Sequence, residues 1–343
     1  MSQGSSLNRY AGLDVLKLIC SFLVVYIHQP FPGEVGGFVM PLTRVAVPIF
    51  FMITGFFYSQ TREKGKEKSQ IVKILKLLIV SHVLYFAFHI LLNIQSLGDY
   101  LMRFTEGKLW FEFLCLNESP FQALWYLSAL LYTLILVYLW EKKWDRKKLY
   151  PLIPILLAVN IILSKFSVAL FGTAVSLVYV RNFLFAGLPF FLLGDFLHNH
   201  PIKIKKVFLV IGTAAFAVLT LAEHAVLNAL QMNLCQDLYI STIFSAISLF
   251  LLALPGEKTA ERENGRNILA FLGRKCATTV YLLHPAMIVV LALTAGLIAR
   301  HISIFYYYTY IAPIAVFVGS VIVALLWDLL KKKIKPLFVR SAP

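Results

Sequence analysis

Four polar side chains lie at helical spacing in the first apolar segment of the chain: Asp14, Lys17, Ser21 and His28. In a helix, Lys17, Ser21 and His28 share one stripe and Asp14 lies beside it. Lys17 and His28 are separated by roughly 16 Å at 1.5 Å per residue, so the stripe crosses much of a hydrocarbon core about 30 Å thick. Because lipid does not tolerate ionisable groups, we expect this face to meet a cavity or other helices.

His28 is the candidate general base of this stripe. Histidine is the side chain best suited to take a proton from a hydroxyl near neutral pH. The alternative is an interfacial histidine that is hydrogen-bonded to a neighbour. Asp14 and Lys17 likewise have two interpretations: they bind an anionic ligand that enters from the cytoplasm, or they form a helix ion pair whose lysine reaches the interface.

Basic residues gather at the start of the third apolar segment. Those from Arg62 to Lys68 are typical of a solvated loop that faces lipid headgroups. Lys73 and Lys76 penetrate the apolar segment, and lysines in this position can bind phosphate groups.

Arg44 and Arg181 each begin an apolar segment at the end opposite to most basic residues. They indicate either polar chemistry at the outer mouth, such as orienting an acceptor, or ordinary interface anchoring. Trp125 and Tyr126 are typical interfacial aromatic residues. His284 lies in a late apolar segment, and its surroundings in sequence do not resemble a metal site. The chain has no serine hydrolase, zincin, Walker or Rossmann motif.

The composition indicates a membrane protein. Of the 343 residues, 59% are hydrophobic and 14% are charged, and the mean hydropathy is +0.77. Apolar runs long enough to span a bilayer recur along the whole chain. We predict an all-α, polytopic helical bundle that forms a single integral membrane domain, residues 1–343. Its ten spans are expected at 12–30, 43–59, 71–94, 122–140, 149–165, 181–198, 206–222, 238–255, 277–299 and 306–330.

The charge distribution predicts the topology. With the N-terminus in the cytoplasm, the inner loops hold 26 of the 32 Lys and Arg residues. This asymmetry follows the positive-inside rule and places both termini in the cytoplasm. It also explains the net charge of +15 without a nucleic-acid partner.

Two further predictions concern the outer side and the N-terminus. The outer loop of residues 95–121 is rich in aromatic residues, which favours a lid or a short interfacial helix. Cys115 and Cys235 both fall in outer loops, and the sequence leaves open whether they pair. The first apolar segment lacks a cleavage site and is expected to remain as an anchor.

The order of motifs resembles the membrane acyltransferase-3 family, which includes O-acetyltransferases of bacterial surface polysaccharides and peptidoglycan. The family's opening signature is similar to Asp14-Val-Leu-Lys17 followed by His28. Its second-span motif is similar to Val47-Pro-Ile-Phe-Phe-Met-Ile-Thr-Gly55-Phe56. Its LWYL and YLxH motifs match residues 124–127 and 281–284. The resemblance covers nearly the whole chain.

Two departures narrow this resemblance. Lys17 stands where the family has arginine, and an arginine-rich motif is reduced to Lys73 and Lys76; lysine keeps the charge but loses the bidentate fork. With residues 181–194 and 235–241, these changes look most like the membrane half of the vancomycin-resistance serine racemases and its stand-alone relatives. Because the sequence ends soon after the tenth span, we expect no racemase half.

The resemblance implies an O-acetyltransferase of the bacterial inner membrane. Acetyl-CoA would be the donor and a cell-envelope glycan or small hydroxyl compound the acceptor, with no metal. His28 would be the base and Arg44 would stabilise the oxyanion; Asp14, Lys17, Lys73 and Lys76 would bind the donor. Trp125, Tyr126, Arg181 and His284 would bind the acceptor. The alternative is a transporter of a small polar amino acid such as serine, whose route the same stripe would line. The sequence does not predict an oligomeric state.

Overall fold

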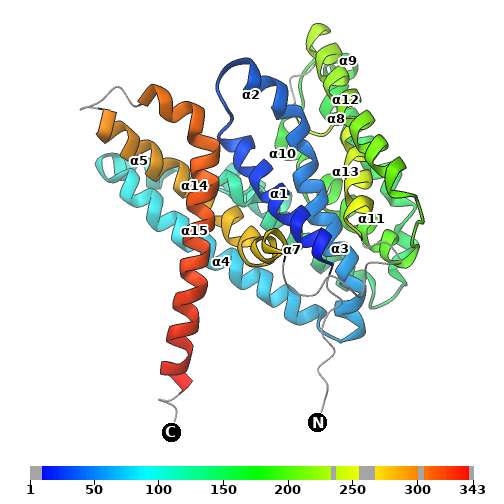
Figure 1. Ribbon diagram of the computed structural model, residues 1–343, viewed down its shortest axis with the longest axis horizontal. Coiled ribbons are helices and arrows are strands. Elements are labelled where there is room, and N and C mark those ends of the chain that lie inside the picture. The colour runs from blue at the N-terminus through cyan, green and yellow to red at the C-terminus, as the bar shows by residue number, and fades with distance from the viewer. Residues whose placement is uncertain (1–9, 233–236, 255–266, 300–304, 340–343) are drawn as a thin grey trace. The chain divides into compact units, whose positions relative to one another are not determined.

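The chain is helical along nearly its whole described length (Figure 1). The computed structural model describes residues 10–232, 237–254, 267–299 and 305–339, and none of these residues lies in a strand. Seven helices in these ranges are long and apolar enough to cross a membrane, and three shorter apolar helices accompany them. The predicted all-α, polytopic membrane class is therefore confirmed; the inward orientation of the termini stays a prediction.

Each of the ten predicted spans coincides with a helix or a pair of consecutive helices. They are α1 (Ala11–His28), η1 (Met40–Val45) with α3 (Ala46–Glu63), α4 (Glu67–Leu92), α7 (Trp125–Trp140), α8 (Leu152–Lys165), η6 (Phe183–Gly187) with α11 (Leu188–Asn199), α12 (Lys206–Ala229), α13 (Ile240–Ala253), α14 (Ile268–Ala299) and α15 (Phe305–Val339).

Two boundaries differ most from the prediction: the start of α14, and the end of α15 at Val339 and not at residue 330. Helix α14 begins at Ile268, inside the predicted inner loop, and not at residue 277. The side chain of Asn267 accepts a hydrogen bond from the backbone N–H of Ala270 (3.1 Å), which is a typical helix N-cap. The short apolar sequence Ile-Leu-Ala-Phe-Leu that follows then continues into the membrane helix without a break.

The remaining elements are short. They are α2 (Gly33–Val39), η2 (Ile94–Ser96), α5 (Leu97–Met102), η3 (Arg103–Thr105), α6 (Gly107–Leu116), η4 (Gln122–Leu124), η5 (Arg146–Leu149), α9 (Ser167–Phe171) and α10 (Leu177–Val180). The aromatic outer loop thus forms several short helices. Trp110 in α6 donates a hydrogen bond to the carbonyl oxygen of Phe104 (2.7 Å). Cys115 is exposed near the end of α6, whereas Cys235 lies outside the described residues, so their pairing is not tested.

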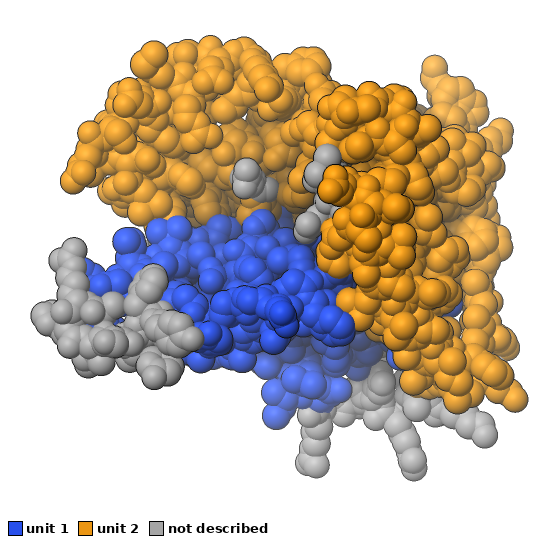
Figure 2. Space-filling view, turned by 90° about the horizontal axis from the view of Figure 1, so that it is seen from above, with its two compact units in different colours: residues 1–46, 250–343 blue, residues 47–249 orange. Residues whose placement is uncertain are grey.

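The chain divides into two compact units, which Figure 2 colours separately. Unit 1 comprises Met1–Ala46 and Phe250–Pro343. In this unit, α14 packs against both α1 and α15. The core includes Val25, Cys276, Val280 and Val316. A Cβ atom added to Gly273 of α14 would collide with the backbone carbonyl oxygen of Asp14 in α1. Glycine therefore permits a close crossing of α1 and α14.

Unit 2, Val47–Leu249, contains a similar crossing between α3 and α11. Gly55 of α3 lies against the carbonyl oxygen of Phe191, and Gly194 of α11 lies against that of Met52. Small residues at such crossings let membrane helices approach closely and gain dispersion contacts. Helix α8 packs on α11 and α7 packs on α4 in the same unit.

A buried ionic network lies at one end of the α3–α11 crossing. Arg146 is 6% exposed and Asp195 is fully buried. The guanidinium donates to Asp195 (2.9 Å), to Glu141 (3.0 Å) and to the hydroxyl of Ser59 (2.6 Å). Asp195 also accepts hydrogen bonds from Ser59 (2.9 Å) and Tyr150 (2.7 Å). Each charge in this network has several partners, as buried charges require.

Candidate functional site

The structure brings together two histidines that are far apart in the sequence. His28 is the last residue of α1 and is exposed, whereas His284 of α14 is fully buried. Their ring centroids are 5.0 Å apart and the rings are tilted by 42°. Both residues were predicted as site residues, but the sequence did not indicate that they are neighbours. The close crossing of α1 and α14 at Gly273 holds the two helices that carry them.

A second polar group lies on α1, near its other end. Lys17 forms an ion pair with Asp14 (2.9 Å), as their i, i+3 spacing predicts. Arg274 of α14 also contacts the Asp14 carboxylate (3.4 Å). Asp14 is buried, while the side chains of Lys17 and Arg274 remain 26% and 42% exposed. Two partly exposed cations thus share one buried carboxylate.

Ser21 of the predicted stripe and Arg44, the other predicted polar residues of unit 1, have more ordinary surroundings. Ser21 is fully buried, and its hydroxyl donates to the carbonyl oxygen of Leu18 (2.8 Å). Such a back-bond satisfies the hydroxyl within its own helix. Arg44 is half-buried in η1, which packs against α1. The predicted face of α1 therefore carries its ionisable side chains near its two ends, with the internally bonded Ser21 between them.

In unit 2 the predicted Arg181 joins a small charged cluster. Its guanidinium lies 5.4 Å from the centre of the Trp125 ring, and its Nε atom is 3.6 Å from a carboxylate oxygen of Asp237. Burial raises the pKa of the nearby Glu118 to about 7; the charge of Arg181 opposes this shift and that of Glu112 adds to it. The sequence analysis did not select Glu118 or Asp237. Both are acidic residues in predicted outer segments, as Arg181 is a basic one, and this shared side could have indicated a charged cluster.

Another buried cation lies in the same unit. Lys165 is 1% exposed, and its ammonium nitrogen is 3.8 Å from the centre of the Tyr239 ring. A contact of this kind stabilises a desolvated cation through the ring's negative face. Lys165 was not among the predicted site residues.

The remaining predicted residues of unit 2 are not part of that cluster of charges. Lys73 and Lys76 are exposed on α4, on a surface that also presents Val72, Leu75 and Ile79. Tyr126 is half-buried and its ring contacts those of Phe50 and Phe51, 5.9 and 4.7 Å away. The lysines keep their side chains accessible to an anion, whereas Tyr126 packs mainly against aromatic neighbours.

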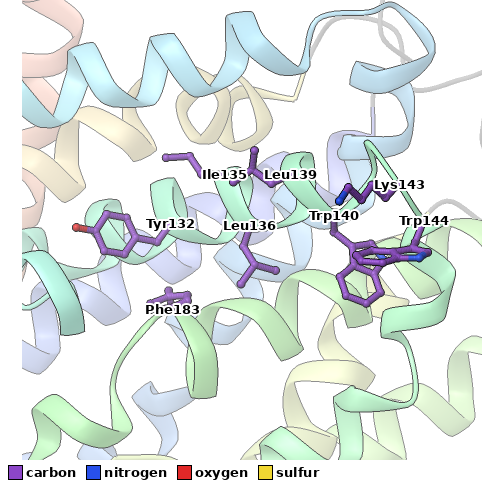
Figure 3. A pocket seen from close by; sticks show the side chains of 8 residues that line it. All are labelled: Tyr132, Ile135, Leu136, Leu139, Trp140, Lys143, Trp144 and Phe183. Atoms are coloured by element: carbon purple, nitrogen blue, oxygen red, sulfur yellow. The ribbon is translucent and has the colours of Figure 1, made fainter.

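An apolar groove of about 680 Å³ runs along α7 in unit 2. Figure 3 shows Trp140 and Trp144 with Lys143 at one end of it, and Tyr132 and Phe183 at the other. Its lining is almost entirely hydrocarbon and aromatic, and the predicted site residues do not contribute to it. The groove suits an apolar chain and offers little for acid–base chemistry.

Together, the geometry supports proton transfer at one end of α1 and anion binding near the other. His28 is accessible and its ring contacts a second imidazole. A histidine in this setting can act as a general base. Of the two cations around Asp14, Lys17 lies on the same helix as His28, eleven residues earlier, and Arg274 lies on α14.

The helices and these ionisable side chains define a multi-pass membrane protein with polar sites in apolar surroundings. Residues 10–332 match the model of the acyltransferase-3 family, which is described as an acyltransferase domain. The chain therefore belongs to this family of membrane acyltransferases.

Two proteins of Enterococcus faecalis named amino-acid racemase are similar to parts of the chain. One is 25% identical over 215 residues, which cover 57% of this chain and 29% of that protein. The other is 29% identical over 145 residues, 38% of this chain and 19% of that protein. The chain thus spans less than a third of the length of these curated relatives. No solved structure matches it.

Proposed function

We propose that this protein is an O-acetyltransferase of the bacterial inner membrane, which transfers acetyl from cytoplasmic acetyl-CoA to a hydroxyl group of a cell-envelope glycan or small acceptor. The observation that carries the proposal is the pair of His28 and His284 at the end of α1, in a chain of the acyltransferase-3 family. The family indicates the class of reaction, which is acyl transfer. The histidine pair supplies a candidate base, His28, at the end of α1.

His28 accepts the proton of the acceptor hydroxyl as the hydroxyl oxygen attacks the thioester carbonyl. Arg44 stabilises the negative charge that develops on that carbonyl oxygen. When the carbon–sulfur bond breaks, the leaving thiolate receives the proton from His28, so that the products are an ester and free coenzyme A. The histidine thus returns to its starting state after each transfer.

The residues around Asp14 fit the negative charge of the donor. Lys17 and Arg274 together carry one positive charge more than the carboxylate between them, and both are partly exposed. We assign these two cations of unit 1 to the donor's phosphates. Lys73 and Lys76 of unit 2 are assigned to the donor separately, from the sequence. Trp125, Tyr126 and Arg181 are assigned to the acceptor.

The first experiment measures acetyl-CoA binding to the purified protein in lipid nanodiscs by calorimetry. We expect saturable binding that Lys73→Ala/Lys76→Ala weakens about tenfold, the equivalent of about 1.4 kcal/mol. The matched control is Lys66→Ala/Lys68→Ala, which removes the same charge from exposed positions of the same segment. Equal weakening by both double variants would indicate a general charge effect and would contradict the assigned phosphate site.

The second experiment tests the base. Radiolabelled acetyl-CoA is supplied with isolated envelope glycans and small hydroxyl compounds, and acetyl incorporation is counted. His28→Ala is expected to reduce transfer by about 10²- to 10⁴-fold, with acetyl-CoA binding retained. Undiminished transfer by a folded His28→Ala protein would exclude the proposed mechanism.

A second candidate function is transport of a small polar amino acid such as serine. The names of the two curated relatives favour it, and the opposite charges of Arg181 and Asp237 beside Trp125 suit a zwitterion. This alternative predicts that serine raises the unfolding temperature of the protein while acetyl-CoA does not. The enzyme proposal predicts the reverse.

A further inference from the structure

His284 presents a polar atom that its surroundings do not satisfy. The side chain is fully buried, and its Nε2 atom has no hydrogen-bond partner among the residues that the structure describes. Buried polar atoms are nearly always paired, so an orphaned one calls for a ligand, a water or a moving partner. The other ring nitrogen, Nδ1, lies 2.7 Å from the carbonyl oxygen of Tyr281.

Pro285 explains why Nδ1 makes that bond. In a continuous helix the N–H of residue 285 would donate to the carbonyl oxygen of Tyr281, but proline has no N–H. The His284 ring supplies the missing donor. A carbonyl oxygen only accepts, so Nδ1 must carry the hydrogen, and in the neutral ring Nε2 is left as an acceptor. The sequence His-Pro therefore determines the tautomer of His284.

The nearest imidazole is that of His28. The two ring centroids are 5.0 Å apart, which accommodates a hydrogen bond between ring nitrogens either directly or through one water. In a direct hydrogen bond between the two rings, the partner nitrogen of His28 must donate, because Nε2 of His284 can only accept. The second nitrogen of His28 then has no hydrogen and can accept a proton. His28 is the exposed member of the pair, and His284 is the buried one.

We propose that His284 is a positioning residue, which holds His28 in the one tautomer and ring orientation that can act as a base, and that Pro285 fixes His284 for this task. The chemistry rests on the proposed function, whereas the hydrogen-bond arrangement does not. His284 keeps accepting from His28 throughout, while the proton of the acceptor hydroxyl moves to the other nitrogen of His28 and then to the leaving thiolate. In this role His284 acts through His28 and does not bind the acceptor itself.

The test reads the tautomers directly. Protein with nitrogen-15 histidine is placed in nanodiscs, and the ring nitrogens of His28 and His284 are observed by NMR and assigned with His28→Ala and His284→Gln. We expect His284 to be protonated at Nδ1 and His28 to occupy one tautomer. In Pro285→Ala, where a backbone N–H returns to Tyr281, His284 should populate both tautomers. His284 protonated at Nε2 in the wild type would overturn the proposal.

Variants at residue 284 separate positioning from packing. His284→Phe keeps the volume but removes the acceptor, and His28 should then populate both tautomers; His284→Gln returns an oxygen near the Nε2 position and should restore one. His82→Phe is the control, because both nitrogens of His82 already have partners, the carbonyl oxygen of Leu78 (2.9 Å) and the hydroxyl of Ser119 (3.1 Å). That variant should leave the His28 signals unchanged. An unchanged His28 spectrum in His284→Phe would refute the inference.

Kinetics distinguish this inference from the proposed function. In acetyl transfer, His284→Phe should lower kcat at least tenfold with little change in the KM for acetyl-CoA, and His284→Gln should recover part of the loss. If the tautomers are as expected but the wild type transfers no acetyl group, the proposed function fails and the histidine arrangement stands. If transfer depends on His28 but not on His284, the positioning role fails and the proposed function stands.

Discussion

Two buried polar regions of this protein differ in how completely they are paired. Around Arg146 in unit 2, the guanidinium and the Asp195 carboxylate each bind several groups, and Tyr58 adds a hydrogen bond to Glu141 (2.8 Å). Around His284 in unit 1, one ring nitrogen is bonded to backbone and the other lacks a partner among the described residues. Both regions lie on a glycine-mediated helix crossing.

The difference separates a saturated structural network from a pair of histidines that keeps an unused acceptor atom. A saturated network has no donor or acceptor to offer, and its charges serve to hold helices in register. A buried acceptor without a partner costs stability, so it calls for an explanation, and the proposed positioning of His28 supplies one. The candidate site is therefore marked by an unpaired buried nitrogen together with the contact between the His28 and His284 rings.

The largest expected effect comes from breaking the saturated network. Asp195→Ala removes three hydrogen bonds and leaves the buried Arg146 charge with one of its two carboxylate partners, Glu141. We expect the free energy of unfolding to fall by about 3–5 kcal/mol, the typical cost of breaking a buried ion pair. Denaturant unfolding in detergent, followed by tryptophan fluorescence, measures this loss.

The matched control is Lys148→Ala, an exposed lysine two residues from Arg146, which should change stability by less than about 0.5 kcal/mol. A double variant, Arg146→Met/Asp195→Leu, should lose less than the sum of its single substitutions, because no buried charge is then left alone. If Asp195→Ala stays within about 1 kcal/mol of the wild type, the network is not the stabilising element described above.

A smaller effect is expected from the glycine crossings under each region. Gly194→Ala and Gly273→Ala place a methyl group against the carbonyl oxygens of Met52 and Asp14, so the helices must separate, at a cost of about 1–3 kcal/mol. Gly194→Ala should act on stability alone. Gly273→Ala should also lower acetyl transfer, because α1 and α14 carry the two histidines.

Gly296 of α14 provides the control for these substitutions. A Cβ atom added there meets open space, so Gly296→Ala should be neutral or slightly stabilising through its higher helix propensity. The comparison is made by thermal unfolding and by the transfer assay on the same preparations. Equal losses of transfer in Gly194→Ala and Gly273→Ala would contradict a special role for the α1–α14 crossing.

The fold was largely predictable because length and hydropathy determine membrane helices. Each apolar run of sufficient length became a helix, and the i, i+3 spacing of Asp14 and Lys17 predicted their ion pair. The early start of α14 was missed because its cap, Asn267, lies in a segment that reads as a polar loop. Local hydropathy and residue spacing were thus sufficient to predict most of the helices.

The candidate site was predictable only residue by residue. His28 and His284 were each marked by chemistry and resemblance, yet their contact depends on helix packing that no local pattern encodes. Arg274 and Asp237 were missed for the same reason, since each meets its partner across two distant segments. The tautomer of His284 is the exception: the adjacent Pro285 already contains that information, once the helix is known.

The smallest effect concerns Glu118. The degree to which its carboxyl group is paired is intermediate between those of the two regions. Burial raises its pKa to about 7, and the positive charge of Arg181 compensates only in part. Because the folded-state pKa lies above the unfolded value, the neutral carboxyl is favoured on folding, and stability is highest below the unfolded pKa and falls as pH rises through 7.

Glu118→Gln should remove this fall and gain about 1–2 kcal/mol at pH 8, a figure reduced for solvent screening. Unfolding is measured between about pH 4 and pH 8, with the exposed Glu106→Gln as control. If both variants follow the wild-type pH dependence, the buried carboxyl is already paired, and the cluster around Arg181 belongs with the saturated network.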